Sequence, residues 1–172
     1  KYLRTLTAEL QRVASHLMGI GFFLQDLGTL GTPLMYAFRL RERILDLFEM
    51  LCGARITVSY MRPGGVFFDA PDDFWPALDQ FLKDFDTEYK ELEQLILENE
   101  IVMVRTRGVS LLPLELAINN SVSGPSLRAS GSDWDWRKMA PYDAYDRMEF
   151  DIPTATGGDN YDRFWGRIQE IH

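Results

Sequence analysis

The fold of this chain depends on the stretch from Asp26 to Gly65, which reads D-L-G-T-L-G-T-P-L-M-Y-A-F-R-L-R-E-R-I-L-D-L-F-E-M-L-C-G-A-R-I-T-V-S-Y-M-R-P-G-G. A carboxylate closes one apolar segment, a glycine-rich corner follows, and a second apolar segment begins with three arginines at alternate positions. The stretch ends with Arg62 before a Pro-Gly-Gly turn. This order predicts two packed helices and a tight turn with polar groups at the corners, but it does not by itself name a reaction.

The segment that leads into this stretch, residues 5–27, carries apolar residues three and four positions apart, as an amphipathic helix does. They are Leu6, Leu10, Val13, Ala14, Leu17, Met18 and Phe22. Gly28 and Gly31 permit positive φ and Pro33 can open a helix, so a second helix is expected to begin there and to end at Gly53. Its inward residues are Leu40, Ile44, Leu47, Phe48 and Leu51. Two helices joined by a short corner should pack antiparallel.

A small β element and a third helix are predicted next. Residues 56–69 hold β-branched and aromatic residues around the Pro-Gly-Gly turn, which indicates a short strand-turn-strand. Asp72 or Asp73 is expected to cap the third helix. Its apolar residues follow the helical period and are Phe74, Leu78, Phe81, Leu82, Phe85, Tyr89, Leu92 and Ile96.

The last part of the chain is less regular. Residues 101–110 predict a short strand, and residues 114–118 predict a single helical turn. Residues 119–153 interleave Ser, Gly, Pro and Asp with aromatic residues, which favour an ordered surface over a linker. We therefore predict a mainly α fold: a bundle of long antiparallel helices with a small β element and a loop-rich C-terminal part. With 172 residues, of which 46% are hydrophobic, residues 1–172 are expected to form one domain.

The charge and hydropathy of the chain restrict its partners. A formal charge of −8 speaks against nucleic acid. Between Asp69 and Glu100 lie 11 acidic residues and only two lysines, so the excess acid belongs to one solvated helix. No apolar run reaches the roughly 20 residues of a membrane span, and no secretory leader opens the sequence. We expect a soluble chain whose link to a membrane is indirect.

The metal-binding and nucleophilic residue types are scarce. Cys52 is the only cysteine, and His16 and His172 are the only histidines, so neither a disulfide framework nor a zinc or iron ligand pattern is present. Phosphate-binding glycine loops, the H-E-x-x-H motif and the nucleophile elbow are also absent from the sequence. A reducing compartment fits this composition. Lys1 is not a start methionine and His172 stops within an apolar period, so the chain reads as a piece of a longer one.

Two residues at corners are the main candidates for a functional site. Asp26 is either a turn aspartate that bonds local backbone or a carboxylate that faces a pocket and tunes a partner such as a histidine. Arg62, beside glycines, either bonds local backbone and carboxylates or stabilises nearby negative charge. The residues alone leave both questions open.

Other charged residues have ordinary structural interpretations. Arg39 and Arg43 lie one turn apart, and their expected partners are Glu42 and Asp46 on the same helix. His16, one residue before an apolar stripe position, is interpreted as a packing histidine. Four residues of alternating charge in the C-terminal part are expected to form an ion-pair network that fixes a loop. They are Arg128, Asp135, Arg137 and Asp146.

Eight sequence segments match the motifs of a known family and occur in the same order as in that family. In the first half they are E-L-Q-R-V-A-S-H-L (9–17), D-L-G (26–28), T-P-L-M-Y-A-F-R-L-R-E-R-I-L-D-L-F-E (32–49) and G-A-R-I-T-V-S-Y-M-R-P-G-G-V (53–66). In the second half they are S-G-P-S-L-R-A-S-G (123–131), W-D-W-R-K-M-A-P-Y-D-A-Y-D (134–146), F-D-I-P (150–153) and G-D-N-Y-D-R-F (158–164). With these the chain resembles the quinone-proximal peripheral-arm subunit of respiratory complex I (NADH-quinone oxidoreductase), which is the D subunit in bacteria and the 49-kDa subunit in mitochondria.

The resemblance implies a function. The chain would be the central part of that subunit, which forms the quinone pocket with a neighbour that carries the terminal iron–sulfur cluster, next to the membrane-arm subunit of the quinone site. Electrons from NADH reach quinone there and drive ion translocation. By resemblance, Asp26 matches the aspartate that bonds the quinone-facing histidine, and Arg62 matches an arginine close to the cluster. This interpretation expects the two residues, as a buried acid and a fixed cation, at one polar corner between two packed helices. No cofactor would be bound covalently by this chain, and it would lie peripherally on the cytoplasmic face of a bacterial membrane.

Three positions depart from the family pattern. Thr57 stands where the family usually has a histidine that links cluster reduction to proton uptake, so we expect a lower and less pH-dependent cluster potential. The corner at residues 28–32 is one residue longer than in the family, and Leu40 replaces the usual acid of the R-E-R-E run.

Two other functions stay open at this point. One is the large subunit of a membrane-bound [NiFe] hydrogenase, whose nickel-binding cysteines would fall outside these residues. The other is a non-catalytic scaffold homologue that keeps the fold. For the complex I subunit, the isolated chain is expected to be inactive, because its redox centres and half of its pocket belong elsewhere.

Overall fold

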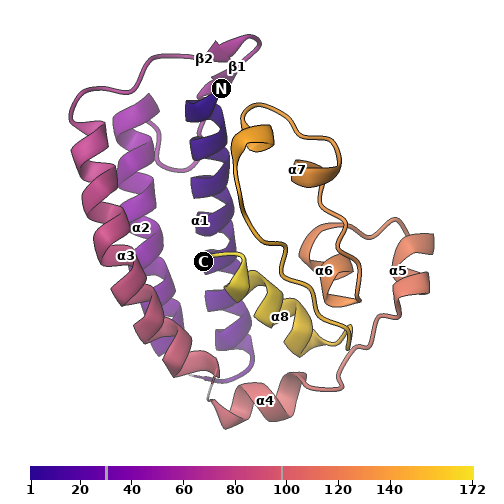
Figure 1. Cartoon of the computed structure of the whole chain (residues 1–172). Coiled ribbons are helices and arrows are strands. Elements are labelled where there is room, and N and C mark those ends of the chain that lie inside the picture. The colour runs from indigo at the N-terminus through magenta and orange to yellow at the C-terminus, as the bar shows by residue number, and fades with distance from the viewer. Residues whose placement is uncertain (30, 98) are drawn as a thin grey trace.

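The computed structural model describes residues 1–29, 31–97 and 99–172. Three long helices dominate it: α1 (Tyr2–Asp26), α2 (Thr32–Cys52) and α3 (Phe74–Leu97). Figure 1 shows them side by side, with neighbouring helices running in opposite directions. The predicted mainly α fold with a small β element is confirmed. Within the described residues, no helix is both long and apolar enough to cross a membrane.

The helix pair α1–α2 forms as the sequence pattern indicates. All five inward residues predicted for α2 are buried. Gly53 adopts φ of 71°, and this left-handed conformation ends the helix. On α1, Met18 and Phe22 were expected to face inward but are exposed, because the buried stripe continues instead through Ile20, Gly21 and Leu24. The corner after α1 includes residue 30, which lies outside the described residues.

Close packing joins α1 to α2, and ion pairs join α2 to α3. A Cβ placed on Gly21 would lie 2.9 Å from Leu34 Cδ1 and 3.3 Å from Ala37 Cβ, so glycine lets the two helices approach. Arg43, expected to pair along its own helix, bonds instead across to Asp84 and Glu88 of α3, each at 2.7 Å. The predicted pairing within α2 is therefore wrong, since its two acids bind the guanidinium of Arg55, which follows the helix.

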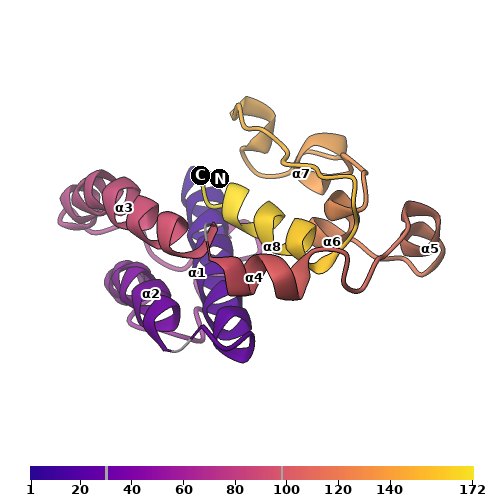
Figure 2. The ribbon, with the colours of Figure 1, turned by 90° about the horizontal axis from the view of Figure 1, so that it is seen from below.

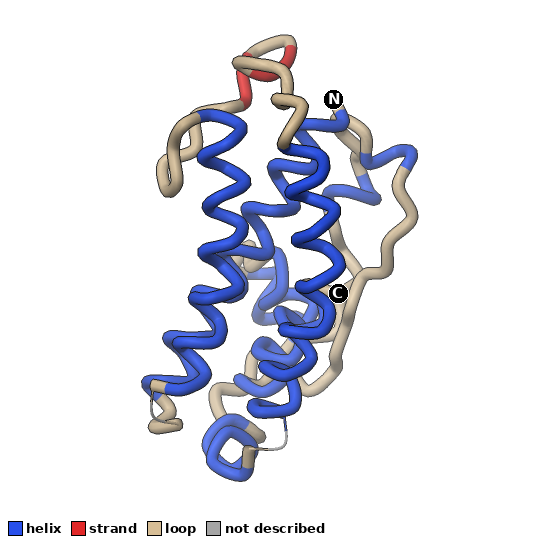
Figure 3. Tube along the Cα trace, turned by 90° about the vertical axis from the view of Figure 1, so that its left-hand side faces the viewer, coloured by secondary structure: helices blue, strands red, loops and turns tan. Residues whose placement is uncertain are grey.

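The β element is a hairpin of two short strands, β1 (Met61–Arg62) and β2 (Gly65–Val66), paired antiparallel. It lies at the end of the bundle where α1 begins (Figure 3). Tyr60 is buried beneath it, and its hydroxyl donates to the carbonyl of Phe68 at 2.7 Å. The hairpin is therefore anchored to the helices on its core side.

The segment after α3 is helical, although a strand was predicted there. Helix α4 (Glu100–Thr106) begins after Asn99, whose side chain accepts hydrogen bonds from the amides of Ile101 and Val102. This cap satisfies amide groups that a β-branched run would otherwise pair in a sheet. The strand prediction for 101–110 is therefore wrong, because tertiary and capping contacts outweigh β propensity.

The C-terminal part is an ordered layer on one side of α1, as predicted. It contains α5 (Leu114–Asn119), α6 (Gly124–Ala129), α7 (Trp136–Met139), a 3-10 turn (Tyr145–Arg147) and α8 (Asn160–Gln169). Figure 2 shows α8 crossing between α1 and α6. The hydroxyl of Tyr89 on α3 donates to the carbonyl of Ile168 at 2.8 Å, which ties α8 to the bundle. Gly158, with φ of 65°, lies so close to Leu112 that a Cβ there would be 2.5 Å from its carbonyl oxygen.

Candidate functional site

Arg62 lies in the hairpin and is held in a defined orientation. Its Nη1 donates to Ser59 Oγ at 2.9 Å, and its guanidinium lies 4.8 Å from the centroid of the Phe67 ring. The carbonyl of Arg62 accepts a hydrogen bond from Arg4 at 2.9 Å, which ties the hairpin to the first turn of α1. The positive charge is therefore fixed by its surroundings while remaining partly exposed.

Thr57 lies on the same segment and lines a cavity of about 500 Å³. The wall of this cavity comprises Thr7, Gln11, Ile56, Thr57, Val58, Ser59, Tyr60 and Met61. Ser59 both lines the cavity and accepts the hydrogen bond from Arg62. Of the three predicted site residues, Thr57 therefore lines this cavity beside the N-terminal half of α1, and Arg62 lies next to it through its hydrogen bond to Ser59.

Asp26 is the last residue of α1 and is exposed. Among the described residues its carboxylate accepts no hydrogen bond, so the local turn interpretation is not observed. The neighbouring backbone is fixed instead, because Arg105 of α4 donates to the carbonyl of Leu27 at 3.0 Å. The last turn of α1 contains no basic residue of its own, and the cation at this end of the helix is Arg105, which binds the Leu27 carbonyl rather than the Asp26 carboxylate.

The structure separates Asp26 from the hairpin. The 25 residues of α1 span about 36 Å, with Asp26 at one end and the hairpin at the other. Sequence reasoning expected a buried acid and a fixed cation at one polar corner. That expectation is wrong, because Asp26 is exposed and an antiparallel helix pair places residues before and after the second helix at opposite ends.

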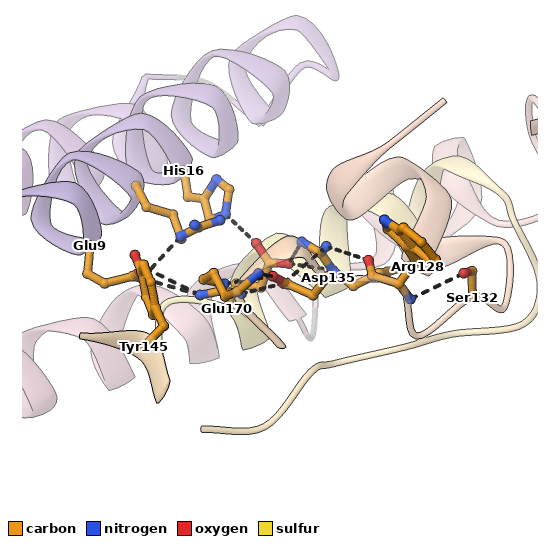
Figure 4. Close-up of polar contacts among 10 residues, drawn as sticks. Glu9, His16, Arg128, Ser132, Asp135, Tyr145 and Glu170 are labelled. Atoms are coloured by element: carbon orange, nitrogen blue, oxygen red, sulfur yellow. Dashed lines mark hydrogen bonds and ion pairs between the residues drawn. The ribbon is translucent and has the colours of Figure 1, made fainter. Parts of the chain in front are cut away.

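A second set of polar groups lies buried where α1, α6 and α8 meet (Figure 4). His16 Nε2 donates to Glu170 Oε2 at 2.6 Å, and the Arg128 guanidinium donates to the other carboxylate oxygen, with Nε at 2.9 Å. The Glu170 side chain is 2% exposed and that of Arg128 is 4% exposed. A buried carboxylate is therefore paired on both of its oxygens.

The same network continues through the loop layer. Arg128 Nη1 lies 3.3 Å from Asp135 Oδ2, and Arg137 Nη2 donates to the same oxygen at 2.7 Å. Arg137 then lies 3.4 Å from Glu9 on α1, and the hydroxyl of Tyr145 donates to Glu9. These contacts fasten α6, α7 and the 3-10 turn to the face of α1.

Electrostatics in this network favours the charged carboxylates. Burial opposes ionisation of Glu170, but the hydrogen bond from His16 and the charge of Arg128 outweigh it and lower the pKa of Glu170. Burial likewise opposes ionisation of Asp135, yet hydrogen bonds from Arg137 lower the pKa of its carboxyl group. Burial and the contact with Glu9 raise the pKa of Tyr145, which therefore stays a neutral donor.

The predicted ion-pair network is confirmed for Arg128, Asp135 and Arg137. Asp146 does not join it, since it is exposed and its nearest basic group is Arg147 at 3.8 Å. His16 is satisfied by a partner, as expected for a packing histidine.

Sequence reasoning missed Glu9, Tyr145 and Glu170. The position of Glu170 between the buried residues Ile168 and Ile171 was the available signal, because an acid there needs a partner.

Metal-binding geometry is limited in the described part of the chain, where no cluster of three or more His, Cys, Asp or Glu side chains could hold an ion. Cys52 is a free thiol whose Sγ donates to the carbonyl of Phe48 at 3.3 Å.

Comparison with known proteins gives consistent matches. Residues 26–172 match the family described as "Respiratory-chain NADH dehydrogenase, 49 Kd subunit". The chain is 55% identical over 171 residues to the D subunit of the NADH-quinone oxidoreductase of Dehalococcoides mccartyi strain ATCC BAA-2266, covering 99% of this chain and 47% of that protein. It is 47% identical to the first D subunit of the corresponding enzyme of Roseiflexus sp., covering 99% of this chain and 46% of the relative.

A third relative is the first C/D subunit of the NADH-quinone oxidoreductase of Aquifex aeolicus, which is 45% identical over 99% of this chain and 29% of its own length. The chain therefore spans about half the length of the D-type relatives that it matches.

Proposed function

Because the chain belongs to the 49 kDa subunit family of respiratory-chain NADH dehydrogenases, we propose that it is the central part of a D subunit. In this proposal it helps to form the quinone pocket of an NADH-quinone oxidoreductase, next to the terminal iron–sulfur cluster of a neighbouring subunit. The observation that supports it most directly is the cavity that Thr57 and Ser59 line, with Arg62 fixed beside it.

Arg62 supplies a fixed positive charge on the side of the proposed site that faces the iron–sulfur cluster. The cluster, when present in the neighbouring subunit, accepts and donates single electrons. A positive charge held near it favours its reduced, more negative form. Ser59 and Phe67 fix the guanidinium in advance, so little reorganisation is needed when the charge of the cluster changes. Thr57, at the position where the family usually has a histidine, cannot take up a proton in response.

Asp26 is assigned to a separate contact at the other end of α1. Its carboxylate is exposed at the C-terminal end of α1, where a negative charge is the less favourable one for the helix dipole. In the proposal this carboxylate accepts a hydrogen bond from a histidine that faces the quinone and lies outside these residues. It would orient that histidine and stabilise its protonated form.

The proposal places the chain in a larger assembly. Its partners would be the subunit with the terminal cluster and the membrane-arm subunit of the quinone site, and its location the cytoplasmic face of a bacterial membrane. Quinone reduction there would be coupled to ion translocation. The relatives are all named as NADH-quinone oxidoreductase subunits, which favours this function over a nickel hydrogenase.

Substitution of Asp26 by asparagine in the assembled enzyme tests the quinone role. We expect Asp26→Asn to slow NADH–quinone turnover by about 10-fold or more, on the order expected for loss of an acid–base partner, while NADH oxidation by an artificial acceptor is unchanged. Asp79→Asn, at an exposed aspartate of α3, serves as the matched control.

Stability measurements separate the functional role from a structural one. Asp26→Asn removes an unfavourable helix–dipole interaction, so it should leave the unfolding temperature of the enzyme unchanged or slightly raised. Unchanged quinone turnover would remove Asp26 from the site, and a scaffold homologue would show no turnover even in the unsubstituted enzyme. The isolated chain is expected to be inactive.

A further inference from the structure

A second cavity, of about 400 Å³, lies between α1, α6 and α8. Its wall comprises Gly19, Ile20, Phe23, Ser126, Asn160, Arg163, Phe164 and Arg167. The volume falls within the range of pockets that bind small molecules. Two arginines and no acidic residue line this wall, in a chain whose formal charge is −8.

Arg167 carries a positive charge that no carboxylate among the described residues pairs with directly. Its Nη1 donates to the carbonyl of Arg163 at 2.8 Å, and among the described residues no carboxylate lies within 4.0 Å of it. The acid nearest along α8 is Glu170, whose two oxygens are already bonded to Arg128 and His16. Burial lowers the pKa of the Arg167 guanidinium, and the more distant charge of Glu170 only partly opposes this.

Arg163 has a different role in the same wall. Its guanidinium donates to the carbonyls of Gly158 and Ser110, at 2.7 and 2.8 Å, and to Asn160 Oδ1 at 2.5 Å. It therefore fixes the loop before α8 and adds positive potential. The remaining N–H groups of Arg167 are left as the donors for a ligand, with the Ser126 hydroxyl and the Asn160 amide beside them.

The rest of the wall is apolar. Ile20, Phe23 and Phe164 form it, and the rings of Phe23 and Phe164 are tilted by 34° with centroids 5.6 Å apart. Gly19 leaves its side of the wall open, since a Cβ built there would meet nothing within 4 Å. The cavity therefore offers a cationic end and an apolar end to the same occupant.

We propose that this cavity binds an amphipathic oxyanion, with a carboxylate or phosphate on Arg167 and an apolar chain or ring against Phe23 and Phe164. A guanidinium binds either oxyanion through two parallel hydrogen bonds, and the partly buried position strengthens the pairing. The source is a free fatty acid or the headgroup of an anionic lipid. This site goes beyond the proposed function and does not rest on it, because none of its lining residues belongs to the quinone or cluster contacts.

Photolabelling of the assembled enzyme tests the site. The probe is decanoate carrying a photoreactive diazirine, and labelled peptides are identified by mass spectrometry. We expect labelling within α1 near Gly19 and within α8, with competition by unlabelled decanoate. The matching decanol probe should label these peptides at least about 10-fold less, since it lacks the charge that Arg167 binds. Competition by decyl phosphate and by phosphatidylglycerol vesicles distinguishes a free acid from a lipid headgroup.

Three variants make the result decisive. Arg167→Gln should reduce labelling about 10-fold or more, and Gly19→Leu should block it by filling the cavity without a backbone clash. Arg147→Gln, at an exposed arginine, is the control and should label normally. Co-purification of each variant subunit with the other subunits of the enzyme confirms that it has assembled.

Two outcomes would overturn the proposal. Equal labelling by decanoate and decanol would show an apolar cleft without anion selectivity. Absence of labelling at α1 and α8 would show that another part of the assembly covers the cavity and neutralises Arg167. Neither outcome affects the quinone and cluster roles, which the Asp26→Asn assay tests separately.

Discussion

His16 and Glu170 are 154 residues apart in sequence, yet Nε2 of one lies 2.6 Å from Oε2 of the other. The contact joins the middle of α1 to the C-terminal end of α8. Through Arg128 it also joins the loop layer that contains Asp135 and Arg137. This buried network links the C-terminal part of the chain to the helical bundle.

Removal of the Glu170 charge should destabilise the protein. Glu170→Gln leaves the buried guanidinium of Arg128 without its closest carboxylate, and loss of one partner of a buried pair costs about 3 kcal/mol. We expect that decrease in the free energy of unfolding of the full-length subunit, measured by urea unfolding with circular dichroism. Glu91→Gln, at an exposed side chain that lies 3.8 Å from Arg39, should change it by less than about 0.5 kcal/mol. Equal effects of the two substitutions would refute the role of the network.

The network should also make stability depend on pH. The folded-state pKa values of Glu170 and Asp135 are lowered from their ordinary values of 4.5 and 3.8. Their contribution is therefore fully present above those ordinary values and is lost as the pH falls through the lowered ones. The difference in unfolding free energy between wild type and Glu170→Gln should be constant from about pH 6 to about pH 5 and shrink at lower pH. A difference that grows on acidification would contradict this sign.

Two glycines on α1, separated by a single residue, provide a matched pair. Gly19→Ala adds a methyl group into open space and replaces a poor helix former, so it should stabilise the protein by roughly 0.5–1 kcal/mol. Gly21→Ala gains the same helix propensity but forces its Cβ against Leu34 and Ala37. Overpacking of this kind costs about 1–3 kcal/mol. Gly21→Ala should therefore be the less stable variant in thermal unfolding by at least about 1 kcal/mol, and indistinguishable variants would show that the helices adjust freely.

Thr57 allows a test of the cluster side of the proposed site. The wild-type assembled enzyme should show a cluster potential with little dependence on pH, because threonine does not titrate. Thr57→His, which has room in a cavity of about 500 Å³, should introduce a slope approaching about 59 mV per pH unit for a one-electron, one-proton step. Redox titration followed by electron paramagnetic resonance measures both slopes. Thr57→Asn is the non-titrating control, and a steep slope in the wild type would remove Thr57 from this role.

The three long helices could be predicted from the sequence because the patterns that specify a helix involve residues close together in the chain. Apolar residues at three- and four-residue spacing predicted α1, α2 and α3, and Gly53 marked the end of α2. The predictions that were wrong failed because contacts between distant segments outweighed the local pattern. Residues 101–110 were predicted as a strand from β-branched content, but the Asn99 cap and packing against α8 make residues 101–106 helical, and a turn follows. Met18 and Phe22 were expected to be buried, but no described element covers that side of α1 closely enough to bury them.

The features of the candidate site likewise fall into two groups, those that the sequence determined and those that only tertiary packing decided. Sequence alone determined that Asp26 and Arg62 stand at corners, that Arg128, Asp135 and Arg137 alternate in charge, and that the chain carries the family's motifs in order. Only the tertiary structure decided that Asp26 and the hairpin of Arg62 lie at opposite ends of α1, and that His16, Glu170 and the partly exposed Glu9 complete one network. The physical reason is range: helix formation and capping depend on residues within a few positions of one another. Pairing of buried charges depends instead on which distant segments share a low-dielectric interior, and that is settled only when the whole chain has packed.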